Sequence, residues 1–238
     1  MTSKEPPVSH TADCDSLASL TRKILDCTRC ERLAAHRREV ARVKRRAFRN
    51  WDYWGKPVPG FGESDARLVI VGLAPAAHGA NRTGRMFTGD SSGDWLYEAL
   101  YRFGFATQPE SNARDDGLQL IDCYITAAAR CAPPQNKPSA LELANCQPYL
   151  EAELALLGNK RVVLTLGRIA HERYLRASGC WSATPVKERP RFGHNRTAEL
   201  GGVTLLTSFH PSRQNTNTGR LTRRMWHAVF RTVRKLLG

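Results

Sequence analysis

The sequence predicts a three-layer α/β/α fold around a central four-stranded parallel sheet. Four short apolar runs, typical of buried strands, alternate with segments that have helical spacing. Alternation of this kind places helices on both faces of a parallel sheet, with right-handed crossovers between the strands. With 238 residues, of which 41% are hydrophobic, the chain is long enough for one large domain. We therefore expect a single domain over residues 16–238, after a disordered tail over residues 1–15.

The first expected element is a helix within residues 16–47, where leucine, isoleucine and valine recur at helical spacing. This stretch runs into a dense series of arginine and lysine residues between positions 37 and 49. Such a series is more often the solvated face of a helix than a binding site, so by itself it assigns no function. Aromatic residues and a turn-rich segment follow over residues 51–62.

Strands are expected over residues 67–73 and about 118–128, because both segments are largely apolar. The helix between them is expected to begin after Ser91 and Ser92 and to bury Trp95, Leu96, Leu100 and Phe103.

Ser139 and Glu142 form a capping-box pattern that predicts the start of the next helix. The third strand is expected over residues 161–166, with a helix from about Arg168, and the fourth over residues 203–209. The last helix is expected to bury Leu221, Met225, Val229 and Val233. Ligands of such sheets bind outside the carboxyl ends of the strands, so the loops that follow the first, second and fourth strands are the candidate site.

The chain is strongly basic, with 36 Lys and Arg against 22 Asp and Glu, a net charge of +14 and a pI near 9.9. This excess favours partners that are phosphate polymers or anionic membranes, and a merely basic enzyme is the competing interpretation. No apolar run approaches the roughly 20 residues that span a bilayer, and the first 15 residues lack an apolar signal core. We expect a cytoplasmic or nuclear protein with reduced thiols and no membrane partner.

Seven cysteines, an odd number, argue against a pure disulfide framework. The two-residue gap between Cys27 and Cys30 lets both sulfurs reach the same metal or cluster, and Cys131 and Cys146 complete a candidate four-thiolate site. Four cysteines leave no coordination position open, which favours a structural centre over a catalytic one. The ligand type alone does not distinguish iron–sulfur from zinc.

The loop over residues 72–90 is too long and too rich in glycine to be a mere connection. Its small residues let the backbone approach a ligand closely, and Phe87 offers a ring for stacking. The spacing of its glycines matches neither the dinucleotide-binding nor the Walker pattern, so a nucleotide cofactor is the weaker interpretation.

The other two loops also carry polar groups suited to nucleic acid. His210 stands at the end of the fourth strand, before a dense run of hydrogen-bond donors in which hydroxyls and Arg213 can contact phosphates. Asn136 lies in the loop after the second strand, close to Cys131 in sequence. An amide offers both donors and an acceptor, and therefore reads the polar edge of a nucleobase well.

Together these segments resemble the uracil-DNA glycosylase superfamily, in particular the type-5 (class B) iron–sulfur uracil-DNA glycosylases. The segment that begins Gly72-Leu73-Ala74-Pro75 and ends at Asp90 is similar to the first motif of that family. The second motif is similar to His210-Pro211-Ser212-Arg213-Gln214-Asn215-Thr216. Cys27, Cys30, Cys131 and Cys146 fall where family members hold a [4Fe-4S] cluster. The resemblance runs from about Leu25 to the C-terminus.

The resemblance implies a DNA repair glycosylase with the uracil-DNA glycosylase fold. Such an enzyme flips uracil out of DNA and releases it by hydrolysis, leaving an abasic site for base excision repair, and the family suggests hypoxanthine and etheno-cytosine as further substrates. The expected partner is DNA that contains a deaminated base, double-stranded or single-stranded, bound by a monomer associated with the nucleoid. The motif loops have no evident lysine for a Schiff base, so strand cleavage is not expected.

The resemblance also implies roles for residues. Phe87 would stack on the flipped base, Asn136 would contact its polar edge, and His210 would hydrogen-bond the carbonyl oxygen where negative charge grows. The base pocket would further include Ala74, Ala76 and His78, although a hydrogen bond that stabilises the loop is an equal alternative for His78. DNA contacts are expected from Ser212, Arg213, Gln214 and Thr216.

The water-activating group differs from that of the related classes. Related classes carry an acidic residue or an asparagine early in the first motif, where this chain has Ala76 and Ala77. Asp90 is the nearest acidic candidate, and its alternative role is to cap the helix that begins near Ser91. Asn215 is expected to help order the loop or the water. A metal-stabilised nucleic-acid-binding protein without catalysis is the alternative function; the lack of Walker or paired-carboxylate motifs disfavours phosphoryl transfer.

Overall fold

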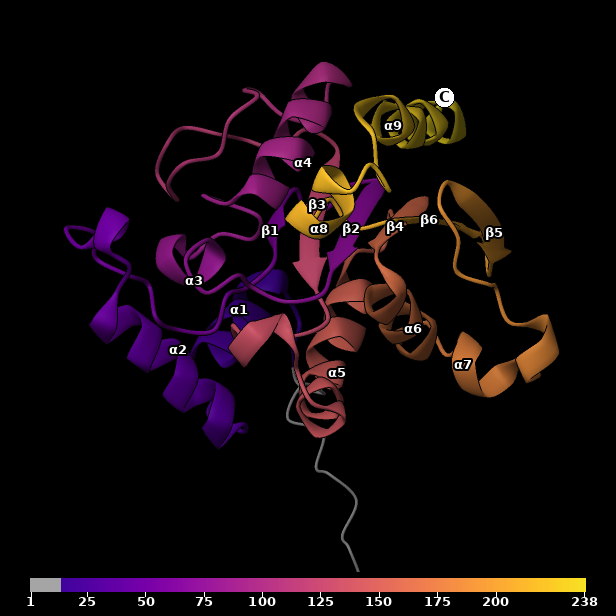
Figure 1. Cartoon of the computed structure of the whole chain (residues 1–238). Coiled ribbons are helices and arrows are strands. Elements are labelled where there is room, and N and C mark those ends of the chain that lie inside the picture. Colours follow the sequence, from indigo (N-terminus) through magenta and orange to yellow (C-terminus); the bar gives the residue numbers. More distant parts are fainter. Residues whose placement is uncertain (1–13) are drawn as a thin grey trace, which may run out of the picture.

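The computed structural model describes residues 14–238 and forms a six-stranded sheet between two layers of helices (Figure 1). The strand order is β1-β3-β2-β4-β6-β5. The strands are β1 (Phe61–Gly62), β2 (Leu68–Gly72), β3 (Cys123–Ala127), β4 (Val162–Leu166), β5 (Arg196–Leu200) and β6 (Val203–Ser208). The helices are α1 (Leu17–Leu25), α2 (Glu31–Val43), α3 (Ala80–Thr83), α4 (Ser91–Arg102), α5 (Ala140–Leu156), α6 (Arg168–Ala177), α7 (Cys180–Ala183), α8 (Arg213–Asn217) and α9 (Arg223–Leu237). Single 3-10 turns occur at η1 (Arg46–Phe48), η2 (Pro134–Asn136) and η3 (Val186–Glu188).

The four predicted strands form the parallel centre of the sheet, in the order β3-β2-β4-β6. Every residue of β2, β3 and β4 is buried, which is why these strands are continuous apolar runs in the sequence. The sheet is nevertheless mixed, because β1 and β5 pair antiparallel at its two edges. Neither edge strand was predicted: β1 has only two residues, and β5 is largely exposed and polar. The expected α/β fold is confirmed, with these two additions.

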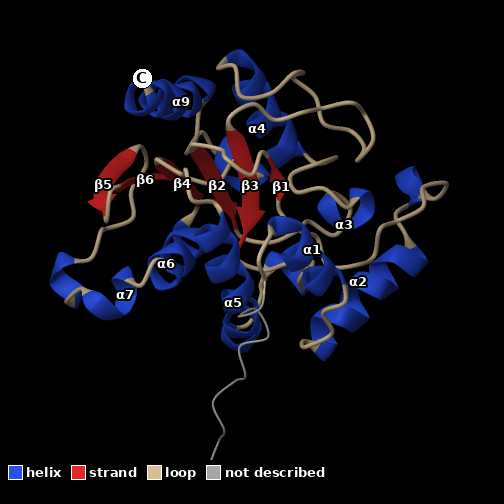
Figure 2. Ribbon diagram, turned by 180° about the vertical axis from the view of Figure 1, so that it is seen from behind, coloured by secondary structure: helices blue, strands red, loops and turns tan. Residues whose placement is uncertain are grey.

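Helices cover both faces of the sheet (Figures 1 and 2). On one face α4 and α9 pack on the strands, and on the other α5 and α6 do so, with α1 lying against α5. In α9 the buried side chains are Trp226, Val229, Phe230 and Val233. The expected residues Leu221 and Met225 also pack on this core, although Leu221 precedes the helix. These layers hold the carboxyl ends of the parallel strands at one edge of the molecule.

Two boundaries differ from the expectation. The helix expected within residues 16–47 is two helices, because α1 ends at Leu25 and Cys30 has extended backbone where α2 begins. Four of the five residues between the two helices are Asp, Thr or Cys, which are poor helix formers. The second strand begins at Cys123 rather than near 118, because Asp122 has a φ of 51° and interrupts the extended backbone.

Two expectations concern the ends of the chain and membranes. Of the tail expected over residues 1–15, residues 1–13 lie outside the described part of the chain. Among residues 14–238, none of the helices combines the length and the apolar character needed to cross a membrane.

The capping box expected at Ser139 is present, with both of its reciprocal hydrogen bonds.

Candidate active site

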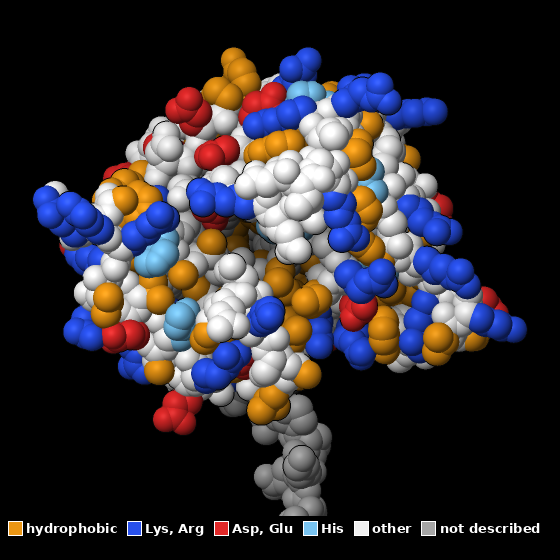
Figure 3. Space-filling view, in the orientation of Figure 1, with side chains coloured by type: hydrophobic (Ala, Val, Ile, Leu, Met, Phe, Trp, Pro, Cys, Tyr) orange, Lys and Arg blue, Asp and Glu red, His pale blue; other side chains and the backbone are white. Residues whose placement is uncertain are grey.

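The three candidate loops meet at the carboxyl edge of the sheet. The amides of Ala128 and Ala129 donate to the carbonyls of Gly72 and Leu73, at 3.0 and 2.9 Å, so the loops after β2 and β3 start side by side. On the other side of β4, the Gly167 amide donates to the Ser208 carbonyl at 2.9 Å, beside the end of β6. Figure 3 shows a hollow in this face next to α8, with hydrophobic side chains along its walls.

Phe87 and His210 lie against each other in this region. Their ring centroids are 5.8 Å apart and their planes differ by 26°, a stacked arrangement. The Phe87 ring reaches this place over Gly72, where a Cβ atom would lie only 2.8 Å from its Cζ. The backbone at Phe87 has a φ of 55°, which is unusual for a residue with a side chain. The structure thus brings together residues from the first and second predicted motifs.

His210 is a neutral imidazole in this setting. Its side chain is partly enclosed, and burial lowers its pKa from 6.5 to about 4. The side-chain amide of Asn215 donates to the His210 carbonyl at 2.8 Å and so fixes the turn between His210 and α8. A neutral imidazole carries one N–H, which suits it to donate a hydrogen bond to a carbonyl oxygen that gains negative charge.

Asp90 caps α4, as its alternative interpretation predicted. Its Oδ1 accepts from the amides of Ser92 and Gly93 at 2.9 and 3.0 Å. The other oxygen, Oδ2, faces Gly79, where a Cβ atom would lie 2.2 Å from it. Within the described residues Oδ2 makes no hydrogen bond. Burial raises the pKa of this carboxyl above its usual value, and only Oδ1 takes part in the cap.

The loop after β6 is ordered by short polar contacts. Ser212 caps α8 by accepting from the Asn215 amide at 3.4 Å, and Thr216 donates to the Ser212 carbonyl at 3.2 Å. Arg213 donates through Nε to the Ser91 hydroxyl at 3.1 Å, which links this loop to the first residue of α4, next to Asp90. Gln214 is exposed. These four residues therefore lie on one short helical turn at the mouth of the site.

The remaining residues expected in the base pocket differ in their surroundings. His78 makes the loop-stabilising contact that was its alternative: its Nδ1 lies 3.0 Å from the Tyr53 hydroxyl, and burial lowers its pKa. Ala74 is partly exposed, as is Ala76, whose carbonyl accepts from the amides of two residues further along the loop. Asn136 is exposed at the end of η2, with a φ of 57°.

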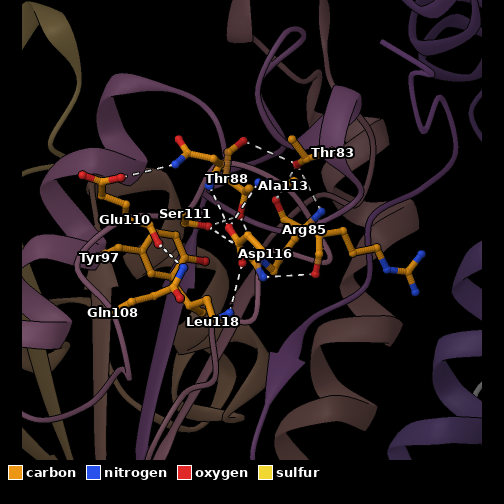
Figure 4. Close-up of polar contacts among 12 residues, drawn as sticks. Thr83, Arg85, Thr88, Tyr97, Gln108, Glu110, Ser111, Ala113, Asp116 and Leu118 are labelled. Atoms are coloured by element: carbon orange, nitrogen blue, oxygen red, sulfur yellow. Dashed lines mark hydrogen bonds and ion pairs between the residues drawn. The ribbon is translucent and has the colours of Figure 1, made fainter.

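Arg85 organises a buried network that the sequence did not indicate (Figure 4). Its Nη2 lies 2.8 and 2.7 Å from the carboxylate oxygens of Asp116 and 2.7 Å from the Ser111 hydroxyl, while its Nε donates to Thr88 at 3.0 Å. Tyr97 donates to the Met86 carbonyl at 2.7 Å from the same side. These contacts fix the backbone on both sides of Phe87. No sequence pattern predicts these contacts, because Arg85 and Asp116 are 31 positions apart and both lie in irregular segments.

A second buried ion pair lies under the loop after β3. Arg130 donates through Nη2 to Glu153 of α5 at 2.5 Å, and both side chains are almost fully buried. Glu153 also accepts from the hydroxyls of Tyr124 and Thr126. Buried pairs of this type hold a fixed geometry, and this one sets the position of the residue that precedes Cys131.

The four thiols expected to form one site occupy one neighbourhood. Cys27 and Cys30 stand between α1 and α2, Cys131 follows β3, and Cys146 lies in α5. Burial and then the neighbouring thiols, Cys146 first, raise the pKa of Cys131 to about 12. All seven cysteines are free thiols. In the described residues, no three His, Cys, Asp or Glu side chains are grouped closely enough to hold one metal ion.

Comparisons with known proteins match the chain to one family. The family model described as the uracil DNA glycosylase superfamily matches residues 59–234. A type-5 uracil-DNA glycosylase of Mycobacterium tuberculosis is 52% identical over 225 residues, which cover 94% of this chain and 82% of that protein. One of Thermus thermophilus is 50% identical over 213 residues, covering 89% and 94%. A type-4 uracil-DNA glycosylase of Pyrobaculum aerophilum is 33% identical over 161 residues, covering 67% and 74%.

Proposed function

The chain belongs to the uracil-DNA glycosylase superfamily, and we propose that it releases uracil from DNA by hydrolysing the bond between the base and deoxyribose. The product is an abasic site, which enters base excision repair. The observation that carries the proposal is the stack of Phe87 on His210 at the carboxyl edge of the sheet, where α4 and its cap Asp90 also begin. We further propose that it acts as a monomer on nucleoid DNA.

The reaction requires the base to leave the helical stack. Extrusion of a nucleotide costs about a few kcal/mol and is easiest at a mismatch such as uracil opposite guanine. Phe87 then offers a ring face to the base, and Asn136 reads its polar edge. Ser212, Arg213, Gln214 and Thr216, at the mouth of the site, contact the DNA and fill the space that the base has left.

His210 stabilises the departing base. As the glycosidic bond breaks, negative charge accumulates on the uracil ring and its carbonyl oxygens. The neutral imidazole donates a hydrogen bond to one of these carbonyl oxygens. Because it carries no extra proton, it does not have to be deprotonated again after each turnover. Fixed donors of this kind commonly supply the largest catalytic effect in an enzyme. The bond from Asn215 to the His210 carbonyl holds the donor in place.

Asp90 orients the water that attacks the sugar. Its Oδ1 is occupied by two backbone amides, so Oδ2 is the oxygen that accepts from water. The sugar cation that forms as the base leaves is stabilised by the DNA phosphates, so it needs only modest help from a general base. A modest requirement is compatible with release of other bases, and we propose hypoxanthine and etheno-cytosine as further substrates.

Cys27, Cys30, Cys131 and Cys146 hold a [4Fe-4S] cluster in this proposal, with zinc as the rival. The chemistry of the donor set supports the group: four free thiols come from three separate segments, and neighbouring thiols raise the pKa of Cys131 after burial does. Within the described residues the thiols do not converge on one metal ion, which favours a cluster, in which each iron takes one thiolate, over a single zinc ion. When bound, the cluster supplies cross-linking rather than chemistry. The residues themselves then join the α1–α2 corner to β3 and α5 and hold the wall of the site that carries Asn136.

Alkaline treatment of a reacted duplex tests the proposed activity. The substrate is a labelled duplex with one uracil opposite guanine, and the control duplex carries thymine at that position. We expect alkali to break the strand at the former uracil and nowhere else, and no break without alkali because the enzyme does not cleave the strand. An intact strand together with retained binding would instead indicate a DNA-binding protein without catalysis. Duplexes with hypoxanthine or etheno-cytosine test the wider substrate range.

Asp90→Asn separates the catalytic role of Asp90 from its role as helix cap. The amide oxygen still accepts from Ser92 and Gly93, so the cap survives while the negative charge is lost. We expect single-turnover release of uracil to fall by about 10- to 100-fold, with DNA affinity retained. Because the raised pKa protonates the wild-type carboxyl as pH falls through it, the wild-type rate falls toward acid pH, and the variant lacks this dependence.

Asp94→Asn is the matched control, because Asp94 is an exposed acid in the first turn of the same helix. It should keep the wild-type rate near neutral pH. Because the charge of Asp94 contributes to the raised pKa of Asp90, the acid limb of the profile should persist and move only slightly toward lower pH. A rate for Asp90→Asn equal to that of the wild type would leave Asp90 as a helix cap alone.

A further inference from the structure

Residues 44–51, called here the basic loop, connect α2 to the aromatic segment before the first motif. They carry four cations and no carboxylate: Lys44, Arg45, Arg46 and Arg49. The three arginines are exposed, and within residues 14–238 none of the four cations forms a salt bridge. Figure 1 draws this loop at the left of the molecule. In Figure 3, which has the same orientation, Lys and Arg side chains cover that part of the surface, on the same face as the hollow. The loop therefore presents positive charge that the described protein does not neutralise.

The loop encloses a groove and has internal order. An open groove of about 710 Å³ is lined by Arg45, Arg46, Ala47, Arg49, Asn50 and Trp51. The rings of Phe48 and Trp51 meet edge to face, with centroids 6.4 Å apart and planes at 83°. Lys44 has a φ of 58°, which turns the chain away from the axis of α2. A groove with guanidinium groups along it and a ring at its wall suits a phosphate backbone rather than an apolar ligand.

Arg82 fixes the basic loop to the first motif. Its guanidinium lies between the rings of Phe48 and Trp51, 4.1 and 4.0 Å from their centroids. The same group donates to the carbonyls of His78 at 2.9 Å and Gly89 at 3.2 Å. Arg82 is 3% exposed, so this cation holds two segments together rather than contacting solvent. One end of this link is therefore the residue before Asp90.

Tyr53 makes a second connection between the same segments. Its hydroxyl lies 3.0 Å from Nδ1 of His78 and accepts from the Arg45 amide at 3.4 Å. Together, the cation–ring contacts of Arg82 and the hydrogen bonds of Arg82 and Tyr53 give the loop a fixed position relative to the site.

We propose that the basic loop is a DNA-contact surface that grips the phosphates of the duplex beside the extruded base. This inference rests on the proposed function, since it assigns the DNA strand a second place on the enzyme apart from the loop after β6. Arg45, Arg46 and Arg49 pair with successive phosphates along the groove. Arg82 is a positioning residue: it holds the basic loop at a fixed place relative to the segment that carries Phe87 and Asp90.

Salt-dependent binding tests the proposal on the full chain. The probe is a labelled duplex with and without uracil, and the variant is R45Q/R46Q/R49Q. Loss of three phosphate contacts should reduce the steepness of a log Kd against log salt plot by about 2.7, at roughly 0.9 for each contact. The affinity at about 0.1 M salt should weaken by roughly tenfold or more. The single variant R46Q should lower the steepness by about 0.9, so the test survives if the triple variant folds poorly.

The matched control is R102Q/R161Q/K235Q, which removes the same charge from exposed positions at the amino edge of the parallel strands. Its slope of log Kd against log salt should equal that of the wild type. If both triple variants flatten the plot equally, or if neither does, the basic loop is not a specific DNA contact and the proposal is overturned. Uracil release by the wild-type protein is measured separately. If the wild-type protein releases no uracil but the basic-loop variant flattens the log Kd against log salt plot as expected, the proposed function is rejected and the basic loop remains a DNA-contact surface.

Discussion

Replacement of His210 by alanine should lower the single-turnover rate of uracil release by about 100- to 1,000-fold, the range seen when one fixed donor to a developing anion is removed. The uracil duplex should still bind, because the phosphates are held by other residues. His210→Gln restores an N–H donor on a side chain of similar reach and should recover part of the loss. The measurement is excision at saturating enzyme, followed in parallel with binding to the same duplex.

His227→Gln provides the matched control for this series. His227 lies in α9, with its Nε2 3.1 Å from Glu98, and no residue of the three loops contacts it in the described structure. Its variant should excise uracil at the wild-type rate. Equal rates of uracil release for His210→Ala and the wild type would show that His210 has no catalytic role.

The pH dependence of His210 follows from its lowered pKa. Burial holds the pKa of the folded state near 4, against 6.5 for an exposed histidine, so the imidazole stays neutral across the range in which the enzyme would be assayed. Between pH 6.5 and 4 the unfolded chain binds a proton that the folded chain does not, and folding stability falls as pH decreases through this window. His210→Gln removes this contribution, so its unfolding midpoint should depend less on pH there than the wild-type midpoint.

Loss of one thiol from the proposed four-cysteine site should have the largest effect on stability. Cys146→Ser leaves three of the four proposed ligands and a buried hydroxyl in α5, and we expect it to lose the iron of the proposed cluster together with its visible absorbance. Metal sites of this kind contribute several kcal/mol or more to folding, and about 1 kcal/mol shifts the midpoint of a chain of this size by about 2–4 °C. A fall of roughly 10–20 °C in the thermal midpoint is therefore expected.

Cys14→Ala is the control for this variant. Cys14 is partly buried against the same small cluster that contains Tyr149, but it is not one of the four expected ligands. It should keep full iron content and lose little stability. Wild-type protein that is colourless and holds stoichiometric zinc would replace the iron–sulfur assignment by zinc while retaining the cross-link. Wild-type protein without either metal would contradict the site.

The sequence was informative where burial imposes a pattern. Strands β2, β3 and β4 are buried along their whole length, so each is a short apolar run that needs no tertiary knowledge to detect. The carboxyl ends of such strands lie at one edge, which is why the three loops of the candidate site could be named in advance. The edge strands β1 and β5 escaped notice, because one has two residues and the other is half exposed.

Contacts between distant irregular segments could not be predicted in this way. Arg82 resembles any other arginine of the first motif in sequence, and only the folded chain places its guanidinium between Phe48 and Trp51. The pairing of Arg85 with Asp116 likewise depends on the path of the loop after α4. Cys27 and Cys30 were recognisable from their spacing, whereas the roles of Asp90, Asn136 and Asn215 stay predictions.

The chain order of the thiols has a consequence for biosynthesis. Cys30 and Asn145, which touch in the folded protein, are 115 positions apart, so Cys27 and Cys30 leave the ribosome long before Cys146 does. At a translation rate of about 5–20 residues per second, that interval lasts roughly ten seconds. Throughout it, the paired thiols are open to oxidants and to competing metals. With the proposed iron–sulfur cluster, the yield of correctly assembled enzyme should therefore decline in cells that are short of iron or under peroxide stress, even when its transcript is abundant.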